Sequence, residues 1–393
     1  MKKIKIVFLE HCTDNTVGGS HYCLLEICRT LDKTRYDATI VFYQKNDLYD
    51  EFVATGHKVR IEQAFEPVAI SQSVPGIIRK VMRPPMNYLK MLVWRAFKWR
   101  ALLKQEGADV LHLNNTFSTD HDAIIAAKML GVKVVSHVRG IEKHLSRMAL
   151  IMSRRIDRVI AISNAVKNNL LNKGVAVDNM RLVYDGINEQ RIVSGVQSGY
   201  LHNTYDLDGQ RVVFGLVGNI KAWKGQRVLV EAVHLLKQKY NDFYCFFVGA
   251  VADPQYQAEL ETYVSQHGLD QHVIFTGYQK NIPDIVNSFD IFVHASIEPE
   301  PFGIVILEAM ALRKPVIVSN IGAPQEIIVD KVSGRLFDIT NPQDLADRLF
   351  ELIEDAAGRK AMGEAGYQRF IEHFTIDRNV AGITDVYDEI LDK

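Results

Sequence analysis

The sequence is poor in cysteine and has no uninterrupted long apolar run. Only four of its 393 residues are cysteines and none forms a C-x-x-C pair, so we expect no disulfide framework and a reducing, cytoplasmic location. The apolar start, Ile4–Leu9, is too short for a signal peptide. The longest apolar stretch, residues 89–103, is interrupted by four Lys and Arg, which excludes a conventional membrane-spanning helix.

The sequence also lacks a substantial net charge, because its two halves cancel. The formal net charge is −1 at pH 7, yet residues 1–200 carry +10 and residues 201–393 carry −11. Such asymmetry suggests that the first half meets an anionic partner. No nucleic-acid-binding motif accompanies the charge, so we expect no nucleic acid and favour an anionic membrane surface.

The basic residues are densest in residues 79–104, which hold eight Lys and Arg and no acidic residue. At 100° per residue, Trp99 and Leu103 fall on an apolar stripe, whereas Trp94, Phe97 and Lys98 fall on the other side. Cations beside aromatic rings suit adsorption to anionic lipid headgroups, so we expect a peripheral protein on the inner face of the membrane. The alternative is an ordinary solvated helix face.

Short runs rich in Val, Ile and Phe alternate with longer helical patterns, which predicts parallel β-α-β units. The length favours two doubly wound α/β domains, and a loss of periodicity near Asp185–Gln210 marks their boundary. The predicted strands are Ile4–Glu10, Ala38–Phe42, Asp109–Leu113, Lys133–His137 and Arg158–Ile162, followed by Arg211–Val217, Phe243–Val248, Val273–Thr276, Ile291–His294 and Pro315–Ser319.

Two glycine-containing loops each join a predicted strand to a helix, where backbone N–H groups can approach a phosphate. Gly18 and Gly19 lie in the first half, and residues 218–225, with Lys221 and Lys224, lie in the second. Neither loop has the G-x-G-x-x-G spacing of a dinucleotide site. Each loop taken alone could also be an ordinary solvated turn.

A loop and helix near residue 300 are the most informative part of the sequence. Glu300 ends a loop after a predicted strand, and Glu308 lies eight residues later within a helix. One carboxylate could meet sugar hydroxyls and the other ribose hydroxyls, while the N–H groups of Phe302, Gly303 and Ile304 face phosphate. The structural alternative for Glu308 is a buried cap or ion pair.

These motifs together resemble the retaining glycosyltransferases of family 4, which have the GT-B fold, and the likeness covers nearly the whole chain. It rests on the two glutamates with Pro301-Phe302-Gly303 between them, on the 218–225 loop, on Gly18-Gly19, and on residues 183–187 and 320–326. One departure is Asn219, where the family often has arginine. Lys221 could supply the missing cation.

The resemblance implies two Rossmann-like domains that face a central cleft. Residues 1–190 would bind the acceptor, residues 191–373 would bind the nucleotide sugar, and residues 374–393 would form a helix that crosses back to the first domain. The enzyme would move a sugar from a UDP- or GDP-sugar to a glycan or lipid-linked acceptor, with retention of configuration, as in cell-surface polysaccharide biosynthesis. It would need no metal or other cofactor.

The resemblance also assigns roles to residues. Lys224 should contact the donor diphosphate, Glu308 the ribose and Glu300 the transferred sugar, and His137 should lie near the donor sugar. The expected catalytic residues are therefore His137, Glu300 and Lys224, and the expected donor-binding residues are Gly18, Gly19, Gly218, Asn219, Lys221, Lys224, Phe302, Gly303, Ile304 and Glu308.

Two other functions remain open at this point. Sugar-nucleotide epimerases that rearrange or hydrolyse UDP-N-acetylhexosamine share the fold and need no acceptor. The second alternative is a sensor that binds a sugar nucleotide without turnover. Such a protein would have a degenerate catalytic site, and the intact Lys224, Glu300 and Glu308 argue against that.

Overall fold

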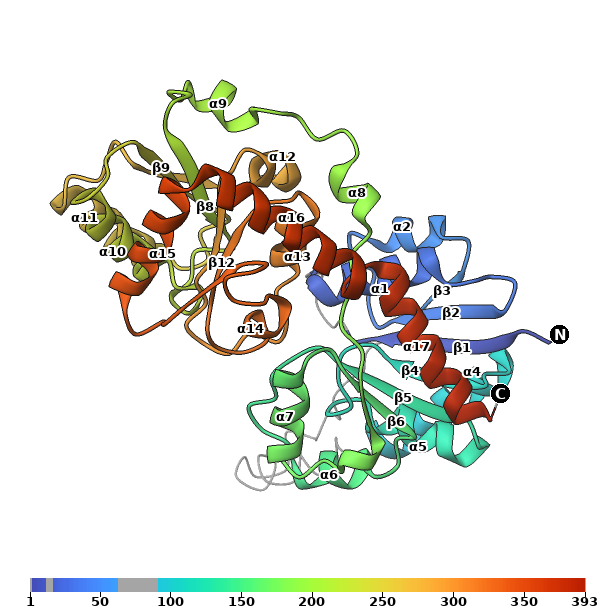
Figure 1. The fold of residues 1–393 in the computed structure, drawn as a ribbon. Coiled ribbons are helices and arrows are strands. Elements are labelled where there is room, and N and C mark those ends of the chain that lie inside the picture. The colour runs from blue at the N-terminus through green and yellow to red at the C-terminus, as the bar shows by residue number, and fades with distance from the viewer. Residues whose placement is uncertain (1, 12–16, 63–90, 393) are drawn as a thin grey trace, which may run out of the picture. The chain divides into compact units, whose positions relative to one another are not determined.

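The structure is a computed structural model that describes residues 2–11, 17–62 and 91–392. It divides into two compact units, residues 1–184 with 379–393 (unit 1) and residues 185–378 (unit 2), and Figure 1 colours the chain by residue number. The division falls a few residues from the predicted boundaries at 190 and 374. Residues 79–90 of the basic stretch lie outside the described residues.

Unit 1 is built on a seven-stranded parallel sheet in the order β3-β2-β1-β4-β5-β6-β7. The strands are β1 (Ile4–Glu10), β2 (Tyr36–Phe42), β3 (Lys58–Ile61), β4 (Val110–Leu113), β5 (Lys133–Val138), β6 (Arg158–Ala161) and β7 (Met180–Leu182). The helices are α1 (Gly19–Thr30), α2 (Tyr49–Ala54), the π-helical turn η1 (Met91–Arg95), α4 (Ala96–Glu106), α5 (His121–Leu130), α6 (Arg147–Ser153), α7 (Asn164–Asn172) and a 3₁₀ turn, Val177–Asn179.

Unit 2 is built on a six-stranded parallel sheet in the order β10-β9-β8-β11-β12-β13. The strands are β8 (Val212–Val217), β9 (Phe243–Val248), β10 (Val273–Gly277), β11 (Ile291–His294), β12 (Val316–Ser319) and β13 (Arg335–Phe337). The helices are α8 (Glu189–Val193), α9 (Tyr200–Tyr205), the 3₁₀ turn η3 (Ala222–Lys224), α10 (Gln226–Lys237), α11 (Pro254–Gln266), α12 (Ile282–Asn287), α13 (Ile304–Ala311), α14 (Pro324–Ile327), α15 (Pro342–Glu354) and α16 (Ala356–His373).

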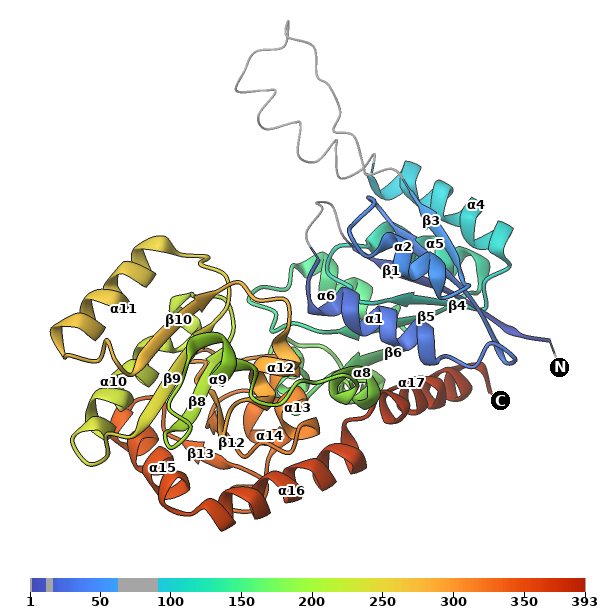
Figure 2. The same cartoon turned by 90° about the horizontal axis from the view of Figure 1, so that it is seen from above.

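Central strands of both sheets are buried on both faces, which explains their continuous apolar composition. All four residues of β4, β11 and β12 are buried, because helices cover both sides of each sheet. In unit 1, α4 and α5 lie on one face, and α1 lies on the other with α17 (Ile376–Leu391), as Figure 2 shows. The ten predicted strands are confirmed, with ends that differ by at most two residues.

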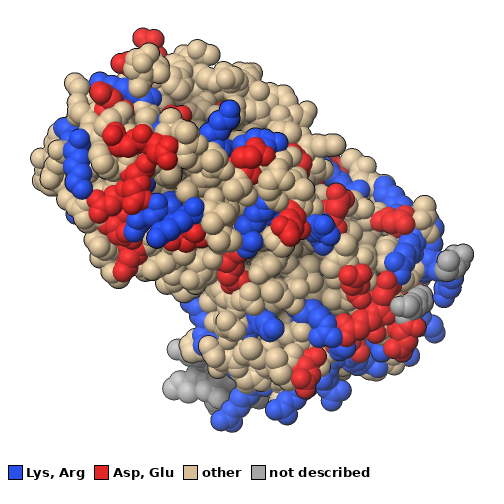
Figure 3. Space-filling model, in the orientation of Figure 1, with Lys and Arg blue, Asp and Glu red and all other residues tan. Residues whose placement is uncertain are grey.

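Helix α17 begins in unit 2 and continues along unit 1. Its Tyr387 hydroxyl lies 2.7 Å from Nδ1 of His112 in β4. Glu389 accepts hydrogen bonds from Arg158 (2.6 Å) and Arg181, and Asp388 pairs with Arg35. Figure 3 shows acidic side chains over the C-terminal end of this helix with basic ones beside them. The negative end of the sequence therefore packs on the positive N-terminal unit.

Candidate active site

The loop of residues 218–225, which contains Lys221 and Lys224, lies at the carboxyl end of β8. Open α/β sheets bind ligands at this edge. Its first glycine, Gly218, packs on the aliphatic stem of Lys224, since a Cβ there would lie 3.6 Å from Cδ of that side chain. The Lys224 ammonium lies 4.1 Å from the centre of the Trp223 ring. These contacts direct one cation of the loop toward the end of the neighbouring strand β11.

Gly225 joins this loop to α10 and is required by geometry. Its φ is +75°, and a Cβ would lie 1.8 Å from the backbone oxygen of Ala295, just after β11. The Trp223 carbonyl accepts a hydrogen bond from the Ile297 N–H at 2.8 Å. The loop after β8 and the loop after β11 are therefore in direct backbone contact.

Glu300 is the centre of a polar cluster between these loops. Its Oε1 accepts a hydrogen bond from the Lys224 ammonium at 2.8 Å, and its Oε2 accepts one from the Ser296 hydroxyl at 2.6 Å. Nε2 of His294, the last residue of β11, lies 2.8 Å from the same Oε2. Burial would raise the pKa of the Glu300 carboxyl, but His294 and Lys224 hold it well below its usual range. Glu300 is thus an ionised carboxylate held at both oxygens.

His294 was not among the expected site residues. A lone histidine at a strand end is usually structural, and nothing in the sequence spacing places it on Glu300. The signal that could have found it is position, because it is the last residue of a strand whose carboxyl end carries the Glu300 loop.

Glu308 lies within α13, half-buried, and burial raises the pKa of its carboxyl to about 7 despite the nearby Arg191. Its carboxyl therefore changes charge near neutral pH. The start of α13 has a tight backbone: Gly303 has a φ of +119°, and Phe302 is buried against Phe374 with ring centres 6.1 Å apart. In the first turn, the Ile306 N–H donates to the Gly303 carbonyl at 2.9 Å, and the N–H groups of Ile304 and Val305 precede any intrahelical carbonyl partner.

Not every predicted donor-binding residue points into the cluster. The side chains of Asn219 and Lys221 are exposed, and the backbone oxygen of Asn219 accepts a hydrogen bond from Gln226 at 3.0 Å. Among the loop's two lysines, Lys224 alone contacts Glu300. Stabilisation of a diphosphate by this loop would therefore rest on Lys224.

His137 is a buried residue near the end of β5. The strand continues one residue beyond the predicted end, to Val138, and the His137 imidazole is fully buried with its ring centre 5.5 Å from that of His112. Nδ1 lies 3.3 Å from the Arg139 guanidinium. Burial, followed by the charge of Arg139, lowers the pKa of His137 well below its usual value. His137 is therefore a neutral residue in the core of unit 1, and its expected role near the donor sugar stays a prediction.

Gly18 and Gly19 of unit 1 are exposed at the start of α1. A Cβ at Gly18 or Gly19 would meet no atom of the described residues within 4 Å, and neither residue has a positive φ. Packing does not require glycine at either position. The absence of side chains leaves the backbone at this helix N-terminus open to close approach.

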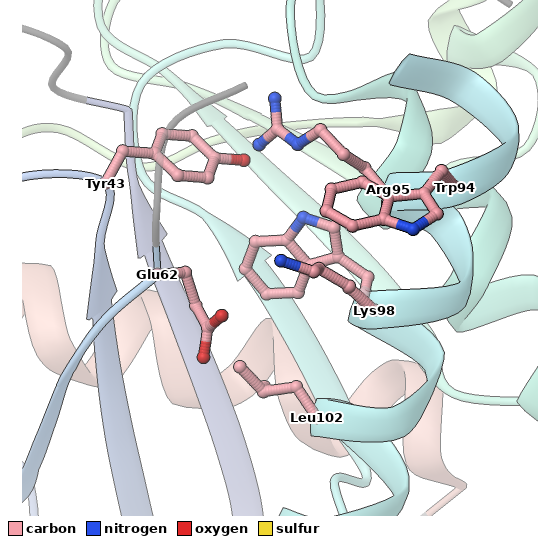
Figure 4. Close-up of a pocket in the computed structure, with 7 residues that line it drawn as sticks. Tyr43, Glu62, Trp94, Arg95, Lys98 and Leu102 are labelled. Atoms are coloured by element: carbon pink, nitrogen blue, oxygen red, sulfur yellow. The ribbon is translucent and has the colours of Figure 1, made fainter. Parts of the chain in front are cut away.

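Unit 1 also has a small pocket at the carboxyl ends of β2 and β3. Figure 4 shows Tyr43 and Glu62 on one side, with the side chains of η1 and α4 on the other. Arg95 lies with its guanidinium 4.5 Å from the Tyr43 ring and contacts Asp122 at 3.0 Å. The pocket is lined by Tyr43, Glu62, Trp94, Arg95, Lys98, Trp99 and Leu102.

The described part of the basic stretch has the predicted two faces. Trp99 and Leu103 are buried, whereas Trp94 and Phe97 are 49% and 60% exposed. Lys98 is exposed beside Trp94, with its ammonium 4.0 Å from the ring centre.

Across residues 2–11, 17–62 and 91–392, no helix has the length and apolarity needed to cross a membrane. Within the same residues no three His, Cys, Asp or Glu side chains are grouped to hold a metal ion.

Two family models match the chain, one for most of each unit. The model described as Glycosyltransferase Family 4 matches residues 17–191, and the model described as Glycosyl transferases group 1 matches residues 201–369. The chain belongs to the family-4-like glycosyltransferases of the GT-B fold. The fold and the enzyme class expected from the sequence are thereby confirmed.

Relatives of this glycosyltransferase span most of its length. An uncharacterized glycosyltransferase of Methanocaldococcus jannaschii is 26% identical over 74% of this chain and 78% of its own. The N-acetyl-alpha-D-glucosaminyl L-malate synthase of Bacillus anthracis is 22% identical over 86% of this chain and 89% of its own.

Solved structures share the fold of this glycosyltransferase. A glycosyltransferase of Rickettsia africae has a TM-score of 0.82 at 23% identity and covers 100% of this chain and 99% of its own. The Anabaena protein HepE, solved in complex with UDP, has a TM-score of 0.81 at 22% identity and covers 98% of this chain and 100% of its own.

Proposed function

We propose that this glycosyltransferase takes its sugar from a nucleoside-diphosphate sugar that binds to unit 2. The observation that carries the proposal is the Lys224–Glu300 pair beside the N-terminus of α13, with Glu308 one to two turns further along that helix. This arrangement offers a cation and N–H groups to a diphosphate, and carboxylates to hydroxyls. The HepE complexes with UDP and with UDP-glucose support the same class of donor.

In this proposal the chemistry is mainly electrostatic. Breaking the bond between sugar and phosphate builds negative charge on the leaving diphosphate, and the Lys224 ammonium with the α13 N–H groups stabilises that charge. Glu300 orients hydroxyls of the transferred sugar. These groups supply the stabilisation without a metal, so EDTA is expected to leave the rate unchanged.

We also propose that the configuration of the sugar is retained by attack on the face that the phosphate leaves. Glu300 accepts hydrogen bonds at both oxygens and its pKa is held low, which makes it a poor nucleophile for a double displacement. The anomeric coupling constant of the product, measured by proton NMR, gives the outcome directly.

A thermal-shift panel of UDP, GDP and ADP with their sugars tests the donor proposal. A ligand that binds only the folded chain raises its melting temperature, and one base is expected to give the largest shift. No shift with any member at millimolar concentration would contradict the proposal. Comparing turnover with and without an added acceptor separates transfer from the epimerase alternative. An epimerase turns over UDP-N-acetylhexosamine equally fast without acceptor, whereas a transferase then shows only slow hydrolysis.

The affinity for the sugar nucleotide should rise with pH through about 7. The raised pKa of Glu308, about 7, keeps most of its carboxyl protonated at pH 6, whereas ribose hydroxyls are best accepted by the ionised form. Between pH 6 and 8 the dissociation constant should fall by up to about tenfold. The sugar nucleotide is the right probe because the terminal phosphate of free UDP titrates in the same range. Glu308→Gln should remove this pH dependence.

We propose further that the exposed side of η1 and α4 lies on an anionic membrane surface, where a lipid-linked or other membrane-borne acceptor would be found. Val93, Trp94 and Phe97 offer apolar surface there, and Lys98 and Lys104 are exposed on the same stretch. Amphipathic aromatic side chains enter the headgroup region while lysines remain near the phosphates.

Co-sedimentation with vesicles of phosphatidylcholine and phosphatidylglycerol tests this surface. Wild type should bind the anionic vesicles and bind less as salt rises. Lys98→Glu should weaken binding by about 30-fold, because it removes one positive charge and adds one negative charge at roughly 1 kcal/mol each. Lys360→Glu, an exposed charge reversal in α16, should not. Equal binding to neutral vesicles, or equal effects of both variants, would contradict the membrane proposal.

A further inference from the structure

The side chain of His294 is 4% exposed, and one of its two ring nitrogens contacts Glu300 in the candidate active site. Nε2 lies 2.8 Å from Glu300 Oε2, whereas Nδ1 is buried and makes no hydrogen bond to any described residue. An apolar side chain would fill the same space without leaving a polar atom unpaired. Leaving Nδ1 buried without a partner costs free energy. The contact of Nε2 with Glu300 offsets that cost and gives a reason for a histidine at this position.

The contacts of Glu300 are divided between its two oxygens. Lys224 holds Oε1, and Ser296 and His294 hold Oε2. In the proposed function the Lys224 ammonium turns to the donor diphosphate, which withdraws the only cation on Oε1 among the described residues. The carboxylate, 12% exposed, would then depend on the partners of Oε2 for its position and its charge.

We infer that His294 is a positioning residue that keeps Glu300 ionised and correctly oriented when Lys224 turns to the donor diphosphate. This inference rests on the proposed function and adds the support of its sugar-contacting carboxylate. His294 donates its Nε2–H to Oε2, which leaves Oε1 directed to a hydroxyl of the transferred sugar. Ser296 donates a second hydrogen bond to the same oxygen, at 2.6 Å.

Two substitutions at His294 separate positioning from packing. Leu keeps much of the volume and removes the N–H, whereas the side-chain amide of Gln can place an N–H near the position of Nε2. The probes are UDP-glucose and UDP, or the pair that replaces them in the thermal-shift panel. Dissociation constants come from calorimetry, and kcat comes from hydrolysis of the sugar nucleotide with water as acceptor.

His294→Leu should lower kcat and the affinity for UDP-glucose together by roughly 10- to 100-fold in kcat/KM, the effect of losing one hydrogen bond to a charged group. Its affinity for UDP should change less than about twofold. His294→Gln should recover most of the loss. His272→Leu, which removes an equally buried histidine of unit 2 with Nδ1 on the Phe243 carbonyl, is the packing control and should leave both nucleotide affinities unchanged.

Three results would overturn the inference: a His294→Leu variant as active as wild type, a His294→Gln variant as impaired as His294→Leu, or equal losses of UDP and UDP-glucose affinity. Failure of the proposed function gives a different result, since wild type itself would then bind neither ligand.

Discussion

Replacing Glu300 by Gln is expected to lower turnover of the sugar nucleotide by about 100-fold or more, read as release of nucleoside diphosphate. The amide keeps the size of the side chain but removes the charge that holds Lys224 and receives the N–H of His294. Lys224→Ala should have an effect of similar size. Glu298→Gln is the matched control, because its side chain is exposed on the same loop as Glu300.

A lost ion pair also lowers stability, and that effect must be separated from the loss of chemistry. Lys224 and Glu300 are only 17% and 12% exposed, and removing one member of such a pair costs about 3–5 kcal/mol. Combining Glu300→Gln with Lys224→Met removes both charges and should recover much of the melting temperature. This double variant should remain inactive. Wild-type turnover in it would contradict the roles given to both residues.

Gly225→Ala is expected to lower the melting temperature of unit 2 by about 10 °C and to abolish nucleotide binding. The methyl group would lie 1.8 Å from the Ala295 backbone oxygen at a φ of +75°, so the end of β11 must move. A loss above about 3 kcal/mol is reasonable for such a clash, and each kcal/mol is worth roughly 2–4 °C in a domain of this size. Circular dichroism and the thermal shift with UDP measure the two effects.

Gly277→Ala is the control for backbone strain alone. Gly277 has a φ of +67°, and a Cβ there would meet no described atom within 4 Å, so the expected cost is about 1–2 kcal/mol. If Gly225→Ala and Gly277→Ala had the same melting temperature, the close contact between the loops after β8 and β11 would not contribute to the stability of the site.

The sequence predicted the central strands because each is buried on both faces and has no polar alternation. It missed β3, β7 and β13, which are short strands at or near sheet edges. In β3, Lys58 and Arg60 alternate with two apolar residues and none of the four is buried, so no apolar run marks it. Pairing with one neighbour, rather than composition, makes these residues strands.

The site was predictable as a set of residue types but not as a set of contacts. Glu300, Glu308 and Lys224 were found from their motifs, yet the pair between Lys224 and Glu300 joins residues 76 positions apart and depends on the backbone contact at Gly225. His137 was predicted as the last residue of its strand, whereas β5 continues to Val138. Strand alternation directs its side chain to His112 in the core.

The path of α17 has a consequence for the order in which the chain can fold. Unit 2 is one continuous segment of the chain. Unit 1 is completed only by the contacts of Tyr387, Asp388 and Glu389, which are synthesised after all of unit 2. During translation the second unit can therefore close first, while the basic N-terminal segment still lacks a helix on one face. Trimming the chain before Tyr387 should consequently expose unit 1 to proteolysis and leave unit 2 intact.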